Sequence, residues 1–189
     1  MKQFVFHAPL KSYDDGCGVL VGHLFITAAH VVEQQPLQWD FNGETITLAR
    51  EDAVLYQYDK TPKGADVAVF SMPGMHSPLV LDTATPEVGT MLDTISYERI
   101  TEPQEGDTIF SRQPKEWFEM RTGKATVTQV DGNFFLCDTS IVLKKGDSGS
   151  PVFRDGKVFG ILHGGREGHP VCLFQSAQSI ARFLQQIGI

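Results

Sequence analysis

The chain has 189 residues, of which 41% are hydrophobic and 21% are charged, a composition typical of folded globular proteins and not of disordered ones. This length suits one large domain or two small ones, and such a chain buries roughly 70% of the surface that its unfolded form exposes. The net charge of −7 argues against a general nucleic-acid binder, because phosphate contacts need clustered Lys and Arg.

The sequence carries no sign of membrane insertion or export. No apolar run approaches the roughly 18 residues of a membrane span, and the apolar stretch within residues 1–7 is too short for a signal peptide. Cys17, Cys137 and Cys172 are an odd number of cysteines and form no disulfide framework, which favours a reducing compartment. We therefore expect a cytoplasmic protein that does not bind membranes.

Short β-type runs recur between turn signals along the chain, as an all-β protein requires. In the first half, strands are expected at residues 18–20, 24–27, 37–41, 45–49, 53–58 and 67–70. The continuous apolar run 24–26 indicates a strand that is buried on both faces. Residues 71–88 hold three prolines, lack clear periodicity and are expected to connect the two halves.

The second half continues the pattern. Strands are expected there at residues 90–96, 108–111, 119–130, 134–138, 151–153, 158–163 and 171–175, with turns at Gly123 and 131–133. Only two segments have helical character: a single turn at 28–32, and residues 176–186. The second places five apolar residues on one stripe, from Ala177 to Leu184, and Ser176 is the expected N-cap.

The segment with the most chemical content is 146–151, which has the sequence GDSGSP. A serine between glycines, followed by Pro and a β run, suits an exposed hydroxyl on a tight turn. Gly146 lets the backbone curl so that amide N–H groups converge near Ser148. Such donors stabilise an oxyanion by about 3–4 kcal/mol each in a known protease, but the serine also needs an adjacent base.

Two other residues offer the groups that a nucleophilic serine needs. His30 follows the strand at 24–27 and two alanines that leave room around its ring, and an imidazole suits a general base near neutral pH. Asp66 opens the apolar run 67–70, where a carboxylate needs a partner such as an imidazole N–H. Taken singly, each motif has a plain structural interpretation: a turn, a structural or solvated histidine, and a strand cap. Their joint occurrence favours a nucleophilic site.

Together the three motifs resemble those of the trypsin/chymotrypsin-like serine proteases. The family's Thr-Ala-Ala-His is matched at 27–30, its Asp-Ile/Val-Ala-Val/Leu at 66–69, and its Gly-Asp-Ser-Gly-Gly/Ser-Pro at 146–151. The resemblance implies an all-β chymotrypsin-like double barrel, made of two six-stranded antiparallel β-barrels with a C-terminal α-helix. An N-terminal barrel within residues 1–75 would carry the His and Asp motifs. A C-terminal barrel within residues 76–189 would carry the Ser motif, with the active site in the cleft between them.

The same resemblance implies a role for each residue. Ser148 would be the nucleophile, His30 the general base and then acid, and Asp66 the residue that orients His30. The backbone N–H groups of Gly146 and Ser148 would form the oxyanion hole. The expected activity is that of a serine endopeptidase acting on a protein or peptide substrate through an acyl-enzyme. Neither a metal nor an organic cofactor is implied.

The sequence departs from the secreted members of this family in two respects. The cysteines that flank the His and Ser motifs of digestive relatives are absent, as in the disulfide-free bacterial and viral branches. No Ile-Val-Gly-Gly segment is present to pair with Asp147 after zymogen cleavage, so we expect no such activation and a different partner for Asp147. Two alternatives stay open: activation by a partner protein, and a protease-fold binding module whose catalysis is vestigial. The intact set of three residues weighs against the second.

The resemblance also implies a specificity pocket whose wall includes the residue six before the serine, here Val142, opposite a wall of Leu162, His163, Gly164 and Gly165. Because Val142 is not acidic, no preference for Lys or Arg is expected. Relatives that cleave after Glu or Gln carry a pocket His in Gly-Ile/Met-His, whereas His163 comes one residue later. A one-residue offset turns a strand side chain to the other face. Leu162 is therefore expected to face the pocket, and a pocket role for His163 is the alternative.

Overall fold

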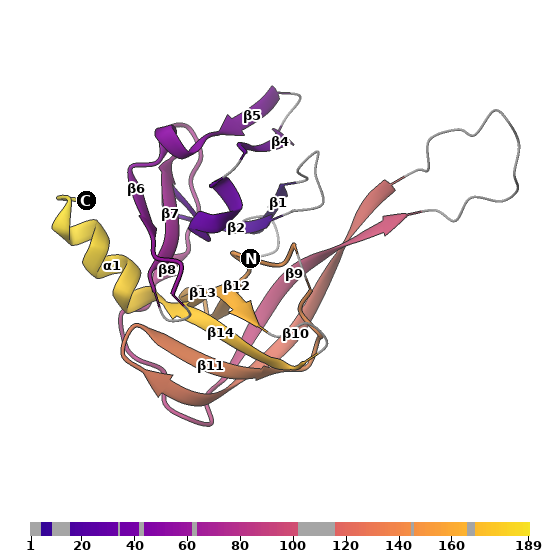
Figure 1. Cartoon of the computed structure of the whole chain (residues 1–189), viewed down its shortest axis with the longest axis vertical. Coiled ribbons are helices and arrows are strands. Elements are labelled where there is room, and N and C mark those ends of the chain that lie inside the picture. The colour runs from indigo at the N-terminus through magenta and orange to yellow at the C-terminus, as the bar shows by residue number, and fades with distance from the viewer. Residues whose placement is uncertain are drawn as a thin grey trace, which may run out of the picture.

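The computed structural model describes residues 5–8, 16–33, 35–41, 44–61, 64–101, 116–144, 146–165 and 169–189. These residues form β-strands, two short 3-10 turns and a C-terminal helix (Figure 1). The strands divide into two halves that follow one another along the chain, which agrees with the expected fold class.

The first half contains a five-stranded antiparallel sheet, in the order β1-β2-β3-β7-β6, and a separate β4–β5 hairpin. Its strands are β1 (Val5–Ala8), β2 (Gly16–Val21), β3 (Leu24–Thr27), β4 (Leu37–Phe41), β5 (Glu44–Leu48), β6 (Leu55–Tyr58) and β7 (Asp66–Ser71). The 3-10 turns among the described residues of this half are η2 (Ala29–Val32) and η3 (Arg50–Asp52). The helical turn expected at 28–32 is thus a 3-10 turn.

The second half is a closed six-stranded antiparallel barrel. Its order is β12-β9-β10-β11-β14-β13, and pairing of β13 with β12 closes the ring. The strands are β9 (Met91–Thr101), β10 (Glu116–Asp131), β11 (Phe134–Thr139), β12 (Pro151–Arg154), β13 (Lys157–Gly165) and β14 (Val171–Ser176). A short strand, β8 (Val80–Leu81), adds to β13 in parallel at the outside of the ring.

A shared core joins the two halves. Strand β3 is buried on both faces, as predicted: Phe25 packs into a cluster of the first half, whereas Ile26 packs into a cluster that draws on both halves. The buried residues of this shared cluster are Val5, Val19, Val21, Ile26, Leu55, Val67, Val69, Leu79, Ile95, Phe153, Val158, Ile161, Ile180 and Leu184. Apolar contact across the boundary therefore holds the halves as one body.

The C-terminal helix, α1 (Ala177–Gln186), begins as the sequence predicts. The Ser176 hydroxyl oxygen accepts a hydrogen bond from the Ser179 N–H at 3.2 Å, which confirms Ser176 as the N-cap. Ile180 and Leu184 of the predicted apolar stripe are buried in the shared core. In the described ranges, no helix has the length and apolar character needed to cross a membrane.

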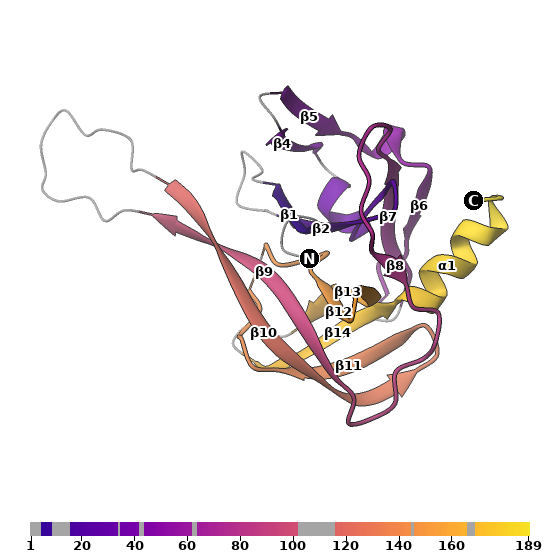
Figure 2. The same ribbon diagram turned by 180° about the vertical axis from the view of Figure 1, so that it is seen from behind.

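Some elements differ from the sequence prediction. Strands β9 and β10 are longer than expected, and together they project from the barrel (Figure 2). Gly123 lies inside β10 and not at a turn; a Cβ there would come within 2.9 Å of Ile141, so the glycine leaves room for that side chain. Strands β1 and β8 are additions to the predicted set, and the strand expected at 108–111 lies outside the described residues.

Candidate active site

Strand register brings His30 and Asp66 together. Strands β3 and β7 are antiparallel, with Thr27 opposite Ala68, so Asp66 at the start of β7 lies beside η2, which carries His30. The His30 backbone N–H donates to Asp66 Oδ1 at 2.9 Å. The ring atom His30 Nδ1 lies 2.6 Å from Asp66 Oδ2, where its N–H donates. These two bonds fix the orientation of the imidazole.

Ser148 reaches the same place from the second half, in the turn before β12. The start of β2 holds this turn: the Cys17 N–H donates to the Ser148 carbonyl at 2.7 Å, and the Thr27 hydroxyl donates to the Cys17 carbonyl at 2.6 Å. Gly149 has a φ of +86°, and a Cβ there would lie 2.0 Å from the Cys17 carbonyl oxygen. The glycine after the serine is therefore required both by its backbone conformation and by this close approach.

The result is a continuous series of hydrogen bonds. Ser148 Oγ lies 2.8 Å from His30 Nε2, on the opposite side of the ring from Asp66. The His30 side chain is 33% exposed, whereas that of Asp66 is only 2% exposed. A hydroxyl at this distance from a neutral imidazole nitrogen can lose its proton as it attacks an electrophile, and a buried carboxylate favours the imidazolium that results.

Gln175 anchors Asp66 from the second half. The Asp66 backbone N–H donates to Gln175 Oε1 at 2.8 Å, and Gln175 Nε2 donates to Ser179 Oγ at 3.3 Å. Gln175 is fully buried on β14, so its side chain ties the start of β7 to the C-terminal helix. Sequence reasoning missed this residue; the available signal is a polar side chain at the end of the apolar run 171–175.

A second imidazole lies close to Asp66. His163 Nδ1 is 3.3 Å from Asp66 Oδ2, and the His163 ring packs against Phe134 in a T-shaped arrangement. The pairing of β13 with β14 shifts between Leu162 and Gly164. This irregularity interrupts the alternation of side chains on which the predicted direction of His163 rests.

Burial also affects the charge of His163, whose side chain is 14% exposed. Burial lowers the pKa of His163; the Asp66 carboxylate opposes this shift, and His30 adds to it. Because the pKa lies below its ordinary value of 6.5, the His163 imidazole is neutral at pH 7.

A cavity of about 360 Å³ opens beside Ser148 and His30. Four of the expected pocket residues line it, namely Leu162, His163, Gly164 and Gly165. The other lining residues, Leu143, Lys144 and Cys172, are not among the predicted ones.

Val142 does not line the cavity. Its side chain is 43% exposed, and its carbonyl accepts a hydrogen bond from Arg121 Nη1 at 2.9 Å. The wall is formed instead by the next two residues, Leu143 and Lys144. Val142 therefore lies directly before the two lining residues of this loop and is not one of them.

Cys17 lies next to the serine turn, where its thiol is buried and packs as part of the structure. Its thiol donates to the Gly146 carbonyl at 3.6 Å, and burial raises the pKa of Cys17 to about 12, which leaves little thiolate at neutral pH. In the described part of the chain, no group of three or more His, Cys, Asp or Glu side chains is placed to hold a metal ion.

Gly149→Ala should disrupt the contact between β2 and the serine turn. We expect it to lower the free energy of unfolding by about 1–3 kcal/mol from backbone strain alone, and further through the clash with Cys17. The measurement is urea unfolding, with Gly89→Ala as the matched control, because Gly89 has a φ of +89° and a Cβ added there would meet no atom within 4 Å. Equal losses in the two variants would contradict the close-contact explanation.

His163→Gln should alter how stability depends on pH. Since the folded state lowers the pKa of His163 below 6.5, the unfolded chain takes up its proton first, and wild-type stability falls as pH decreases through and below 6.5. The variant should lose less stability over this range. Unfolding free energies at pH 5 to 8 test this, with His23→Gln, which removes an exposed imidazole, as the control. Parallel curves for His163→Gln and wild type would refute it.

Several solved structures share this arrangement of strands. Mouse neuropsin, a serine protease expressed in the limbic system of the brain, is 18% identical with a TM-score of 0.69, covering 97% of this chain and 93% of that chain. A scabies mite inactivated protease paralogue is 13% identical with a TM-score of 0.69 and coverages of 98% and 92%. The tobacco vein mottling virus protease is 14% identical with a TM-score of 0.56 and coverages of 92% and 75%.

At these identities the structural likeness shows the fold alone. A search by sequence among curated proteins finds no match. The family model of the trypsin-like peptidase domain, however, matches residues 16–161, a span that includes the His, Asp and Ser motifs. The chain therefore belongs to the trypsin-like peptidase family.

Proposed function

We propose that the chain is a serine endopeptidase that hydrolyses peptide bonds of a protein or peptide substrate. The observation that carries this proposal is the hydrogen-bonded series of Ser148, His30 and Asp66. Ser148 Oγ lies 2.8 Å from His30 Nε2, and His30 Nδ1 lies 2.6 Å from Asp66 Oδ2. The cavity beside Ser148 offers space for a substrate side chain. No part of the proposed reaction needs a cofactor.

In the proposed reaction, Ser148 Oγ attacks the carbonyl carbon of the scissile bond while His30 Nε2 takes its proton. Asp66 stabilises the imidazolium through the bond at His30 Nδ1. His30 then gives the proton to the leaving amine, and the carbon–nitrogen bond breaks to leave an acyl group on Ser148. Water, deprotonated by His30, hydrolyses this ester and restores the serine.

We assign the oxyanion hole to the backbone N–H groups of Gly146 and Ser148. Gly146 lies two residues before the serine in the same turn and has a φ of +98°, a conformation that glycine adopts without strain. The turn is anchored on the second barrel as well as on β2: the Gly149 N–H donates to the Leu162 carbonyl at 2.9 Å, and the Leu162 N–H donates to the Ser150 carbonyl at 2.8 Å. Anchors on both sides of Ser148 support a preformed arrangement of backbone donors, which is the condition for strong oxyanion stabilisation.

The cavity supports a preference for an apolar residue before the cut. Leu143 and Leu162 contribute apolar walls, and the two glycines at 164–165 add no side chain to the lining. Lys144 also lines the cavity, but its ammonium pairs with Glu98. His163 Nδ1 faces Asp66, so that nitrogen is not directed at a substrate. Cuts after Glu or Gln would instead assign His163 to substrate recognition.

We also propose that the enzyme works in the cytoplasm. Cys17, Cys137 and Cys172 are free and buried, although Cys137 and Cys172 are directly opposite each other on β11 and β14. Unpaired thiols at such positions are typical of a reducing compartment.

A fluorophosphonate probe and a peptide library test the proposed activity. Wild type should be labelled and should cleave peptides, whereas Ser148→Ala should not be labelled and should lose about 10⁵–10⁶-fold in kcat. Mass spectrometry of the products identifies the residue before each cut. Ser71→Ala, which removes an exposed serine at the end of β7, is the control and should behave as wild type.

Absence of labelling and of cleavage in folded wild type would contradict this function. It would favour a protease-fold binding module without catalysis; the scabies mite structure of similar fold is likewise that of an inactivated protease paralogue.

A further inference from the structure

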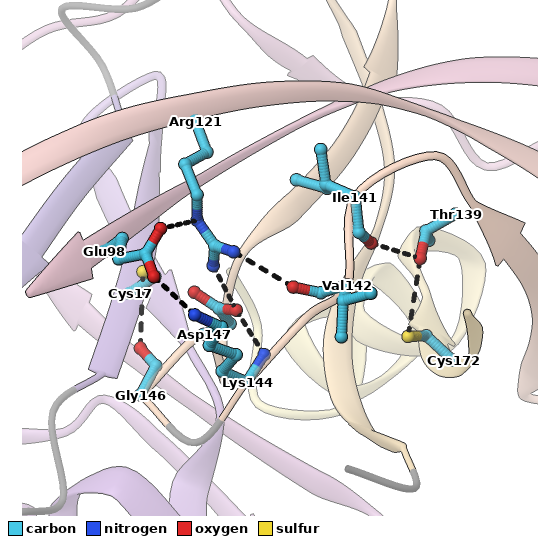
Figure 3. Close-up of polar contacts among 10 residues, drawn as sticks. All are labelled: Cys17, Glu98, Arg121, Thr139, Ile141, Val142, Lys144, Gly146, Asp147 and Cys172. Atoms are coloured by element: carbon cyan, nitrogen blue, oxygen red, sulfur yellow. Dashed lines mark hydrogen bonds and ion pairs between the residues drawn. The ribbon is translucent and has the colours of Figure 1, made fainter. Parts of the chain in front are cut away.

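The reacting groups of the site belong to different halves of the molecule. His30 and Asp66 are carried by η2 and β7 of the first half, whereas Ser148 lies in the turn before β12 of the second. That turn is bound to its own barrel, because Asp147 Oδ2 lies 2.6 Å from Arg121 Nη2 on β10 (Figure 3). The 2.8 Å contact between His30 and Ser148 therefore requires that the two halves keep a fixed relative position.

Gln175 reaches across the boundary between the halves from β14. Its Oε1 accepts a hydrogen bond from the Asp66 backbone N–H at 2.8 Å, so a side chain of the second half holds the residue that orients His30. Gln175 is 0% exposed. A buried N–H that loses its acceptor costs the full desolvation of that group, so the backbone of Asp66 depends on this amide.

Ser179 of α1 fixes the direction of the Gln175 amide. Gln175 Nε2 donates to Ser179 Oγ at 3.3 Å, and the Ser179 hydroxyl donates its own proton to the Ser176 carbonyl at 2.8 Å. Because that proton is already used, Ser179 Oγ accepts from the Gln175 NH₂ group, and the amide oxygen faces Asp66. The first turn of the C-terminal helix thus belongs to the same network as Asp66.

The backbone of Gln175 is held on both sides within the barrel. Gln175 lies opposite Phe134 on β11 and opposite Ile161 on β13. A Cβ added at Gly160 would lie 2.5 Å from the Gln175 carbonyl oxygen, so β13 approaches this residue closely. The Gln175 side chain therefore extends from a fixed point of the second half, and its length sets how closely Asp66 approaches the barrel.

We propose that Gln175 is a positioning residue that acts through the backbone of Asp66 and sets the place of His30 relative to Ser148. Ser179 supports this contact from α1. The inference rests on the proposed peptidase function and deepens it. A misplacement of reacting groups by about 1 Å lowers a rate by about 10²-fold, so one hydrogen bond across the boundary can govern the reaction.

Gln175→Met tests the proposal, because methionine has a similar length but offers no amide. We expect kcat to fall about 10–10²-fold through misplacement of His30. KM should change little, since Gln175 is not among the described residues that line the cavity. Labelling of Ser148 by the fluorophosphonate should slow by the same factor as kcat, because it needs the contact between Ser148 and His30 but no bound peptide.

Gln175→Glu is the conservative variant that separates positioning from general destabilisation. In its neutral form the introduced carboxyl group offers a carbonyl oxygen to the Asp66 N–H and a hydroxyl to Ser179. Burial and the nearby Asp66 carboxylate should raise the pKa of the introduced group, which keeps it neutral near pH 7. Its kcat should therefore approach the wild-type value near pH 7 and fall at higher pH as the group ionises. Equal loss of kcat near pH 7 in the Met and Glu variants would overturn the proposal.

Gln178→Met is the matched control. Gln178 is also a glutamine in the first turn of α1, but its hydrogen bond with Thr85, at 3.2 Å, is exposed. The kcat of this variant should stay within about twofold of wild type, as is usual for surface substitutions. If Gln175→Met does not fold, Ser179→Ala removes the acceptor of the Gln175 NH₂ group and should lower kcat by a smaller factor. A folded Ser179→Ala variant with wild-type kcat would then overturn the network.

The outcomes distinguish the two proposals. Wild type that resists the fluorophosphonate and cleaves nothing would overturn the peptidase function and this inference with it. A reactive wild type, together with a folded Gln175→Met variant that retains the wild-type kcat and labelling rate, would overturn the positioning role alone.

Discussion

The buried carboxylate of Asp66 is the charge on which the geometry of the site depends. Burying a carboxylate is costly unless hydrogen bonds satisfy it. His30 supplies two of these bonds, from its backbone and from its ring, so the contacts that satisfy Asp66 also orient the imidazole toward Ser148. Gln175 holds the backbone of Asp66 from the other half. Stability of the junction and orientation of the reacting groups therefore depend on the same residues.

Asp147 places a comparable constraint on the other side of the nucleophile. Its carboxylate is as buried as that of Asp66, but its side-chain partner is a guanidinium from β10 and not an imidazole. The partner of Asp66 comes from the 3-10 turn η2 and that of Asp147 comes from β10. Ser148 lies between the two carboxylates. Cys17 adds a third anchor through its bond to the Ser148 carbonyl. The serine turn is thus held by both halves of the molecule.

The sequence motifs around His30, Asp66 and Ser148 could be found because each includes the neighbouring residues that shape its own backbone. The structure brings these three side chains within hydrogen-bond distance of one another. Partners from distant strands could not be predicted in this way. Arg121 is 26 residues from Asp147, and Gln175 is 109 residues from Asp66. Pairing within the barrel and packing between the two halves bring them together. The same holds for the length of β9 and β10, which depends on their mutual pairing.

His163 shows how one irregular residue changes the surroundings of a buried carboxylate. With strict alternation along β13, the His163 side chain would point to the opposite face of the strand from its cavity-lining neighbours. The shift in pairing with β14 instead lets the His163 ring line the cavity and approach Asp66. A protonated imidazole there would compete with His30 for the same carboxylate oxygen. Burial opposes that protonation, since it lowers the pKa of His163. The burial of His163 therefore leaves Asp66 Oδ2 to its hydrogen bond with His30.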